Sequence, residues 1–338
     1  MGFTAWKQRI IKCRRVWGDM ALTDDGKPKI VVAGVGGAGC NTINRLLRVG
    51  IGDALPIAFN TDKKHLEIVH EKARKILLGA SVTRGLGAGG FPEVAQKAAL
   101  MSRKQIGEIL DGTDMLFIAA GMGGGTGTGA SPVIAQIAKE KGAVVVAIVT
   151  FPFAIEKARL KKAQEGLNRL LEFADTVVVI DNNRLTEYVP NLQIEKAFEL
   201  ADDITAKAIS GITRTILEPS LINLDFADLK TVMSNGGISM IAVGEGHGYD
   251  KVNQAVENTL KNKLLDVDVT DARGVMVHIS GGSDVTIGEV NGAGEMLTEN
   301  VAKDANVILG ARSEAGVSGK MEVIAIFTGV SVPLFLRK

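Results

Sequence analysis

The chain has 338 residues, 46% hydrophobic and 23% charged, which favours a soluble globular protein of two domains. Its formal net charge of +1 gives no global attraction for nucleic acid, so we expect no nucleic-acid partner. Two cysteines cannot build a disulfide framework, which fits a cytoplasmic protein, and we expect no metal site held by protein ligands alone. No apolar run reaches the ~18 residues of a membrane-spanning helix.

From Lys29 onwards, short β-branched runs alternate with helical stretches. Several runs are continuously apolar, which is typical of strands buried on both faces of a parallel sheet. The sequence therefore predicts a doubly wound α/β domain with a mostly parallel sheet. The expected strands are Ile30–Ala33, Pro56–Asn60, Lys75–Leu78, Met115–Ala120, Ala143–Val149 and Thr176–Ile180, and the expected helices are Thr42–Val49, Pro92–Leu110, Pro132–Lys141 and Glu156–Phe173.

A long helix is predicted over Gln193–Leu217, followed by a smaller α+β domain with shorter strands. The expected strands there are Ile238–Val243, Gly274–Ile279, Asn306–Leu309 and Glu322–Thr328, with helices near Lys251–Asn262 and Val285–Ala302. The predicted divisions are an N-terminal extension (1–28), an α/β domain (29–192), a central helix (193–219), an α+β domain (220–331) and a tail (332–338).

The first of three glycine-rich loops, Gly34–Asn41, follows a predicted strand and precedes a helix. Backbone amides at a helix N-terminus form an anion site, because glycine lets phosphate oxygens approach closely. Alone, this loop fits a dinucleotide-binding fold in which Asp62 would grip a ribose, or a purely structural turn.

The second loop, Gly121–Gly129, has six glycines in nine residues and again joins a strand to a helix. A structural turn would need one or two glycines, so two such loops indicate a polyphosphate held from two sides. The third loop, Thr83–Gly90, is placed to close over a terminal phosphate, or to act as a flexible lid. No Gly-Lys-Ser/Thr motif is present, which argues against an ordinary P-loop NTPase.

The run Gly123–Gly129, Gly-Gly-Gly-Thr-Gly-Thr-Gly, matches the signature of the tubulin family. The chain resembles the FtsZ family of tubulin-like cell-division GTPases at Gly36–Asn41, at Asn60-Thr61-Asp62, at Thr83–Gly89 and at Asn223–Asp228, in the family's order. The resemblance extends over about residues 29–331. It implies a GTP-binding α/β domain, a central helix and a C-terminal α+β domain.

The resemblance also implies a set of residues that hold GTP or GDP. Glu156 would reach the ribose, Arg159 the phosphates, and Ala88 with Gly89 the γ-phosphate. Phe198 would stack on guanine while Asn182 and Asp202 read its edge. Phe198 and Asp202 are four residues apart and share a helix face, although a core Phe beside a solvated Asp is the alternative. The other implied binding residues are Gly36, Gly37, Ala38, Gly39, Cys40, Asn41, Asn60, Gly123, Gly124, Gly125, Thr126, Gly127 and Thr128.

The chain departs from the family pattern in three respects. Lys157 follows Glu156 where the family has Gly, and Arg159 is three positions after Glu156 instead of four. Asp181 replaces the usual Pro before Asn182, and Ser220 replaces the usual Gly after Pro219.

Asp225 and Asp228 are a carboxylate pair in a predicted loop after the long helix. Two acids at this spacing can polarise a water or hold a cation, or can simply cap a helix. The resemblance makes them, with Asn223, a catalytic loop that enters the nucleotide pocket of the next subunit, with Mg²⁺ bridging the β- and γ-phosphates. A site split in this way implies a head-to-tail filament of this chain.

Two rival functions remain open. The first glycine loop alone would fit a nicotinamide- or flavin-dependent oxidoreductase, which the co-purifying nucleotide would identify. A tubulin-like scaffold that binds GTP without hydrolysing it is the second rival, against which the Asp225/Asp228 pair argues.

The sequence also allows predictions for both ends of the chain. Phe3, Trp6, Ile10, Cys13 and Trp17 form an apolar stripe on a basic N-terminal helix, which would pack on this chain or a neighbour, or bind a membrane surface. The tail Val332–Lys338 resembles the FtsZ motif that engages membrane-tethering partners, or extends the last strand. The resemblance places the protein at the mid-cell division site.

Overall fold

The computed structural model describes residues 27–184, 193–218, 220–222, 224–234, 236–261, 264, 267–314 and 318–331. The predicted N-terminal helix, the predicted tail and Asn223 lie outside these residues, so the expectations for them stay predictions. Within the described part, no helix combines the length and the apolar character needed to span a bilayer.

Six parallel strands form the first part of the sheet, in the order β3-β2-β1-β4-β5-β6. This doubly wound order reverses between β1 and β4, because the chain first builds outward to β3 and then restarts on the other side of β1. The strands are β1 (Ile30–Val35), β2 (Leu55–Asn60), β3 (Arg74–Leu77), β4 (Met115–Gly121), β5 (Val144–Phe151) and β6 (Thr176–Asp181).

Apolar side chains on both faces of the strands explain why helices cover this sheet on two sides. In β1, Val31, Ala33 and Val35 pack into one core, which includes residues of α5–α8, while Ile30 and Val32 pack into a second core with α2 and α10. The helices are α2 (Gly36–Val49), α3 (Lys63–Glu67), α4 (Ala80–Thr83), α5 (Pro92–Met101), α6 (Arg103–Ile109), α7 (Thr126–Glu140), α8 (Lys157–Leu171) and α10 (Ile194–Leu217).

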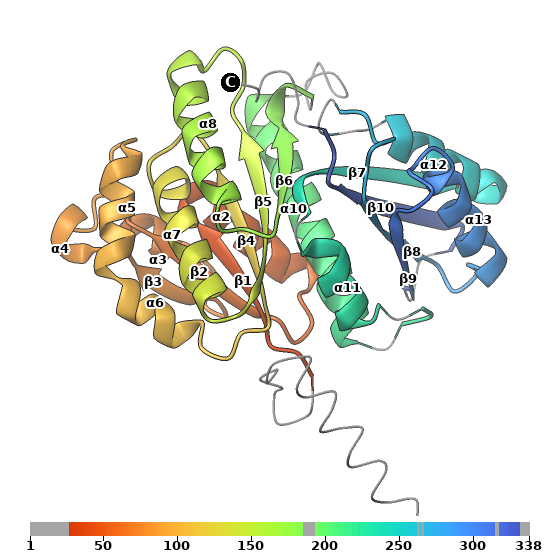
Figure 1. Cartoon of the computed structure of the whole chain (residues 1–338), viewed down its shortest axis with the longest axis horizontal. Helices are drawn as coiled ribbons and strands as arrows, with labels where there is room; N and C mark the ends of the chain where they lie inside the picture. Colours follow the sequence, from red (N-terminus) through yellow and green to blue (C-terminus); the bar gives the residue numbers. More distant parts are fainter. Residues whose placement is uncertain are drawn as a thin grey trace, which may run out of the picture.

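The second part of the chain continues the same sheet instead of forming a separate one. Strand β7 pairs in parallel with β6 and antiparallel with β10, so all ten strands form one sheet with the order β6-β7-β10-β8-β9 at this end. Figure 1 shows this part beside the first, with α12 and α13 packed against it. Its elements are α11 (Phe226–Met233), β7 (Gly237–His247), the 3₁₀ turn η1 (Gly248–Asp250), α12 (Lys251–Lys261), β8 (Gly274–Gly281), α13 (Ile287–Thr298), β9 (Asn306–Ser313) and β10 (Lys320–Thr328).

The central helix α10 links the two parts through charged side chains. The two carboxylate oxygens of Asp203 accept from Nε and Nη2 of Arg45 on α2. Lys207 donates to Glu245 on β7 at 3.2 Å and to Glu322 on β10 at 2.5 Å. Helix α10 therefore contacts both α2 in the first part of the chain and strands β7 and β10 in the second part.

Three of the predicted helices of the first part differ in the structure. The predicted helix Pro92–Leu110 is two helices, because Ser102 leaves the α-conformation (ψ 6°) and its hydroxyl accepts the Gly79 amide at 3.0 Å. Helices α2 and α7 begin earlier than predicted, since the glycine loops themselves supply the first turns. Pro132 consequently lies inside α7, where it lacks an amide for the Thr128 carbonyl.

Candidate functional site

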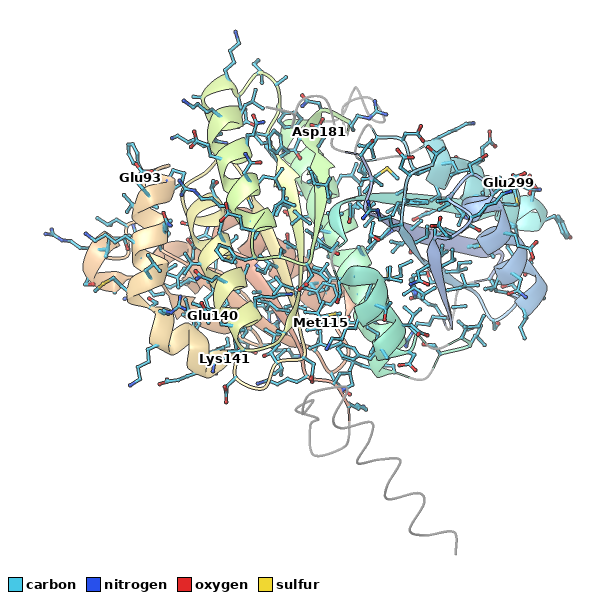
Figure 2. The ribbon with its side chains drawn as sticks, viewed as in Figure 1. Glu93, Met115, Glu140, Lys141, Asp181 and Glu299 are labelled. Atoms are coloured by element: carbon cyan, nitrogen blue, oxygen red, sulfur yellow. The ribbon has the colours of Figure 1, made fainter. Side chains whose placement is uncertain are left out.

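A cleft of about 580 Å³ opens at the carboxyl ends of β1 and β4, where the strand order reverses and where open α/β sheets bind ligands. Figure 2 shows Met115 at the start of β4 low in the view and Asp181 at the carboxyl end of β6 near the top. The volume of the cleft is typical of small-molecule sites. Its lining residues are Val35, Gly37, Ala38, Asn60, Asp62, His65, Gly87, Gly90, Gly121, Met122, Gly124, Gly125, Thr126, Gly127, Thr150, Pro152, Glu156, Arg159, Asn182 and Phe198.

Helices α2 and α7 both begin at this cleft without a capping side chain, and neither has an acidic residue in its first turn. Their first amides and the positive ends of their dipoles are therefore available to an anion. Six predicted phosphate-binding residues line the cleft on these two turns, namely Gly37, Ala38, Gly124, Gly125, Thr126 and Gly127.

The three glycine loops approach one another too closely for side chains. Gly36 has a φ of +75°, and a Cβ there would lie 2.8 Å from the Gly127 nitrogen. A Cβ on Gly125 would lie 2.8 Å from the Ala88 Cβ of the third loop. The loops therefore form one backbone-lined wall, as the sequence predicts for a polyphosphate site.

The two threonines of the second loop have different roles. The Thr126 hydroxyl lies 2.7 Å from the Thr61 hydroxyl just after β2, and Thr126 is one of the residues that line the cleft. The Thr128 hydroxyl, in contrast, is buried and accepts the Gly123 amide at 2.9 Å. Thr128 and Gly123 therefore do not line the cleft in this structure: the Thr128 side chain shapes the loop, and Gly123 is buried against Arg159, so their assignment to the phosphates stays a prediction.

Several predicted residues of the first loop support the cleft without lining it. Gly39 is buried against the Ala119 carbonyl, and Asn41 is exposed outside the lining. Cys40 is fully buried; burial raises the pKa of its thiol to about 12, while a contact of 3.7 Å from the Asn60 amide lowers it slightly. Asn60 lines the cleft, but its side-chain oxygen Oδ1 accepts the backbone amide of Asp62 at 3.2 Å.

The third loop contributes Gly87 and Gly90 to the cleft. Ala88 is buried against Gly125, whereas Gly89 is exposed with a φ of +60°. The resemblance assigns Ala88 and Gly89 to the γ-phosphate, and the structure places both between the two glycines that line the cleft.

Glu156 and Arg159 line the cleft at the start of α8. The Arg159 guanidinium donates to the Glu156 carboxylate at 2.6 Å, and the other carboxylate oxygen accepts the Phe153 amide at 3.1 Å. Glu156 and Arg159, which are three residues apart in this chain, are thus paired with each other across one helical turn.

The far end of the cleft holds the residues assigned to the base. Phe198 is 42% exposed and meets Phe153 edge to face, with ring centroids 5.5 Å apart. Asn182 is buried, and its side-chain carbonyl oxygen has no hydrogen-bond partner. Asp202 lies behind the lining, where it accepts the Thr42 hydroxyl at 3.0 Å. Burial raises the pKa of Asp202 to about 6, although the bond from Thr42 lowers it.

Asp225 and Asp228 lie away from this cleft, after the far end of α10. They belong to a helix that was predicted as a loop: Asp225 is the N-cap of α11 and accepts the Ala227 amide at 2.9 Å, while Asp228 lies in the first turn. Both are exposed. Capping therefore accounts for one Asp225 oxygen, and both carboxylates still face solvent.

Sequence reasoning missed several lining residues, including Met122, Thr150, Pro152 and His65. The first three follow from topology, because they lie at the carboxyl ends of β4 and β5. No pattern marked His65, whose ring lies 3.7 Å from the Cβ position of Gly37 and whose Nε2 is buried without a partner.

Comparison with known proteins identifies the family. The model of the Tubulin/FtsZ family GTPase domain matches residues 29–190, and that of the FtsZ family C-terminal domain matches residues 237–331. The protein named cell division protein FtsZ 2 of Methanocaldococcus jannaschii is 54% identical over 316 residues, covering 93% of this chain and 83% of that protein. The cell division protein FtsZ 2 of Halobacterium salinarum is 50% identical over 305 residues, covering 90% and 77%.

Solved structures agree with this result. A structure titled as an empty FtsZ dimer from M. jannaschii superposes with a TM-score of 0.87 at 43% identity, covering 90% of this chain and 89% of that chain. The match includes both parts of the ten-stranded sheet. The chain therefore belongs to the FtsZ family and is a tubulin-like GTPase.

Proposed function

We propose that this protein is a filament-forming cell-division GTPase whose active site is completed by a second copy of the chain. The observation that carries this proposal is the separation between the cleft, which offers backbone amides, and the exposed acids at the start of α11. The cleft binds GTP, and the acids act on the GTP of the next subunit.

The phosphates are held by the uncapped starts of α2 and α7, because their amides and dipoles favour negative charge. The third loop receives the terminal phosphate, since Gly87 and Gly90 line the cleft beside Gly125. The pair Glu156 and Arg159 separates on binding, so that the carboxylate reaches the ribose and the guanidinium the phosphates.

The base end favours guanine over adenine. Asp202 as a carboxylate accepts from N1–H and the 2-amino group of guanine, neither of which adenine offers in that arrangement. The buried carbonyl oxygen of Asn182 lacks a partner in the free protein and gains one from the base. Phe198 supplies an exposed ring for stacking.

Mg²⁺ fits this donor set when it is bound mainly by phosphate oxygens. Among the described residues, the carboxylates that line the cleft are Asp62 and Glu156, and Asp62 also caps α3. Mg²⁺ retains several waters and takes one or two carboxylates beside substrate phosphates, so this sparse set suits it. When bound, the ion would supply charge neutralisation to the phosphates.

A single molecule cannot bring Asp225 to its own nucleotide. Phe198 lies in the first turns of α10, and the helix continues for 19 residues to Leu217, a rise of about 28 Å at ~1.5 Å per residue. The short connection that follows is fixed to β9 by the bridge between Ile222 and Ala311. A second copy therefore brings the acids to the cleft, and this contact does not close on itself, which gives a filament.

At that contact, Asp225, Asp228 and Asn223 orient and polarise the attacking water. Asp225 has one oxygen on the Ala227 amide, which fixes its rotamer and directs the other oxygen outward. The similar M. jannaschii structure is a dimer, which supports self-association of this chain.

The experiment compares Asp225→Asn with Asp225→Ala. Asparagine caps a helix as well as aspartate does, whereas alanine loses the cap at a cost of about 1 kcal/mol. We expect both variants to bind GTP and assemble, and both to lose turnover by ~10²–10⁴-fold. Full turnover in Asp225→Asn would show that the residue only caps α11, and would refute the catalytic assignment.

Sharing of the site is tested by mixing. Gly124→Glu places a negative charge in the cleft at a position with no atom within 4 Å of the added Cβ, so it blocks phosphate without a clash. Mixed with Asp225→Asn, it should restore part of the activity, because some contacts then join an intact cleft to intact acids. Specific activity should also rise steeply with protein concentration. Activity that stays constant on dilution would contradict the shared site.

The division-site role includes a membrane tether and a mid-cell position. The tail Val332–Lys338 lies outside the described residues, and we propose that it docks a membrane-tethering division protein. Deleting Pro333–Lys338 should leave GTP turnover intact and remove binding to that partner. A large loss of stability would instead assign the tail to the last strand.

A further inference from the structure

The last four residues of the third glycine loop, Gly87–Gly90, carry only one side chain with which to hold their shape. Gly87, Gly89 and Gly90 all have positive φ values, of +85°, +60° and +77°, and the methyl group of Ala88 packs against Gly125. Glycine pays more backbone entropy on ordering than other residues do. An ordered loop of this composition therefore depends on neighbouring groups.

Lys162 on α8 is such a neighbour. Its ammonium donates to the Gly90 carbonyl at 2.7 Å and lies 5.4 Å from the centre of the Phe91 ring. The side chain is half-buried in a groove of about 360 Å³ between α5 and α8. Lys162 thus makes a charge-assisted hydrogen bond to the last residue of the loop and a cation–π contact with the residue that follows it.

The same helix also touches the second glycine loop. Arg159, one turn before Lys162, lines the cleft, and a Cβ on Gly123 would lie 2.9 Å from the Arg159 Cβ. Residues three apart share a helix face. Helix α8, which Figure 1 shows beside α7, therefore holds the second loop with one turn and the third loop with the next.

We propose that Lys162 is a positioning residue that holds the third glycine loop in the conformation that accepts the terminal phosphate. It acts through the Gly90 carbonyl and not by contact with the nucleotide. The inference rests on the proposed assignment of this loop to the γ-phosphate. Because GDP lacks that phosphate, Lys162 sets the preference for GTP over GDP while leaving GDP affinity unchanged.

The experiment measures affinity for GDP and for a non-hydrolysable GTP analogue in the full chain with Mg²⁺, below the assembly threshold. Lys162→Met keeps the aliphatic stem and removes the charge and the donor. We expect it to weaken binding of the GTP analogue roughly tenfold, as expected for a lost charged hydrogen bond, and to change GDP affinity less than twofold. Lys162→Arg, which keeps the charge and donors, should restore most of the preference.

Lys161→Met is the matched control, since Lys161 is the exposed neighbour on the same helix, and it should bind both nucleotides as the wild type does. Phe91→Leu removes the ring contact but not the hydrogen bond to Gly90, so it should reduce the preference for GTP by less than Lys162→Met. Amide exchange over residues 87–91 in nucleotide-free protein should rise in Lys162→Met and not in the control.

Two results would overturn the inference: equal weakening of GDP and GTP analogue in Lys162→Met, or no change in either. Failure of the proposed function would be distinct, because wild-type protein would then bind neither nucleotide, or would bind both without a preference. If Lys162→Met does not fold, Phe91→Leu and Lys162→Arg decide the question. An unchanged preference in Phe91→Leu together with a lost one in Lys162→Arg would also contradict the inference.

Discussion

Replacing Asp202 by Asn should stabilise the nucleotide-free protein while weakening its recognition of guanine. Burial raises the pKa of Asp202 from 3.8 to about 6, so the ionised carboxylate destabilises the folded state above that pH. Each pKa unit corresponds to about 1.4 kcal/mol, so the ionised carboxylate lowers the free energy of unfolding by about 2–3 kcal/mol at pH 8. Asparagine removes the charge and retains an oxygen for the Thr42 hydroxyl.

The sign of the pH dependence follows from linkage. The folded protein binds more protons than the unfolded chain between pH 3.8 and 6, so the stability contributed by protonated Asp202 is lost as pH rises through that window. The gain from Asp202→Asn should therefore be largest at pH 8 and shrink to about a third at pH 4.5. Urea unfolding of wild type and variant at both pH values measures it.

A variant that is no more stable than wild type at pH 8 would refute this reasoning, as would a gain that is equal at both pH values. Guanine recognition provides an independent check. The same variant should lose preference for GTP over a nucleotide that lacks the 2-amino group, because a carboxylate accepts both guanine donors and an amide cannot. Thr42→Val removes the hydroxyl bond without touching the charge and serves as the control for local packing.

The remaining predictions concern glycines and one histidine. Gly127→Ala places a Cβ 2.3 Å from a backbone oxygen and should cost about 1–3 kcal/mol in a denaturant titration, whereas Gly124→Ala meets nothing within 4 Å and should leave stability unchanged. Gly211→Ala should destabilise despite the ~1 kcal/mol gain in helix propensity, because its Cβ would lie 2.7 Å from the buried His278 ring; an increase in melting temperature would contradict this. Burial, with nearby arginines, lowers the pKa of His278 to about 4, so wild-type stability should fall as pH decreases from 6.5 to 4, and His278→Gln should flatten that part of the profile.

The parallel part of the sheet could be predicted from the sequence because burial on both faces leaves a direct signal. Val144–Val149 is apolar at every position, and the structure places these residues in β5, buried on both sides. The glycine loops were equally visible, since two strand-to-helix turns rich in glycine define the switch point of such a sheet. The loops also line the cleft, as expected.

Helix starts and helix α11 could not be placed in the same way. Glycine-rich turns have low intrinsic helix propensity, so the sequence put the start of α7 at Pro132 although tertiary packing forms the helix from Thr126. A helix over Phe226–Met233 was not predicted, because this segment was interpreted as a catalytic loop. Its N-cap aspartate and the apolar spacing of Phe226, Leu229 and Met233 were the signals that favoured a helix.

Side-chain directions within the site were beyond the sequence. Thr126 and Thr128 are two residues apart in one motif, yet Thr126 lines the cleft while the buried Thr128 hydroxyl accepts the Gly123 amide of its own loop. Residues two apart on a helix do not share a face, so the helical start of α7 separates them. The motif identifies the loop, and only the backbone conformation decides which of the two threonines lines the cleft.

The separation of cleft and acids depends on a rigid connection between the two parts of the chain. The pairing of β6 with β7 makes the sheet continuous, and α10 is fixed on both sides through Asp203 and Lys207. A flexible linker would let Asp225 sample many positions, including the chain's own cleft. With the distance fixed by one helix and one sheet, the acids are held beyond the end of α10 that lies away from the cleft. On the proposed function, this geometry would couple hydrolysis to assembly, because each subunit would carry half of two different active sites.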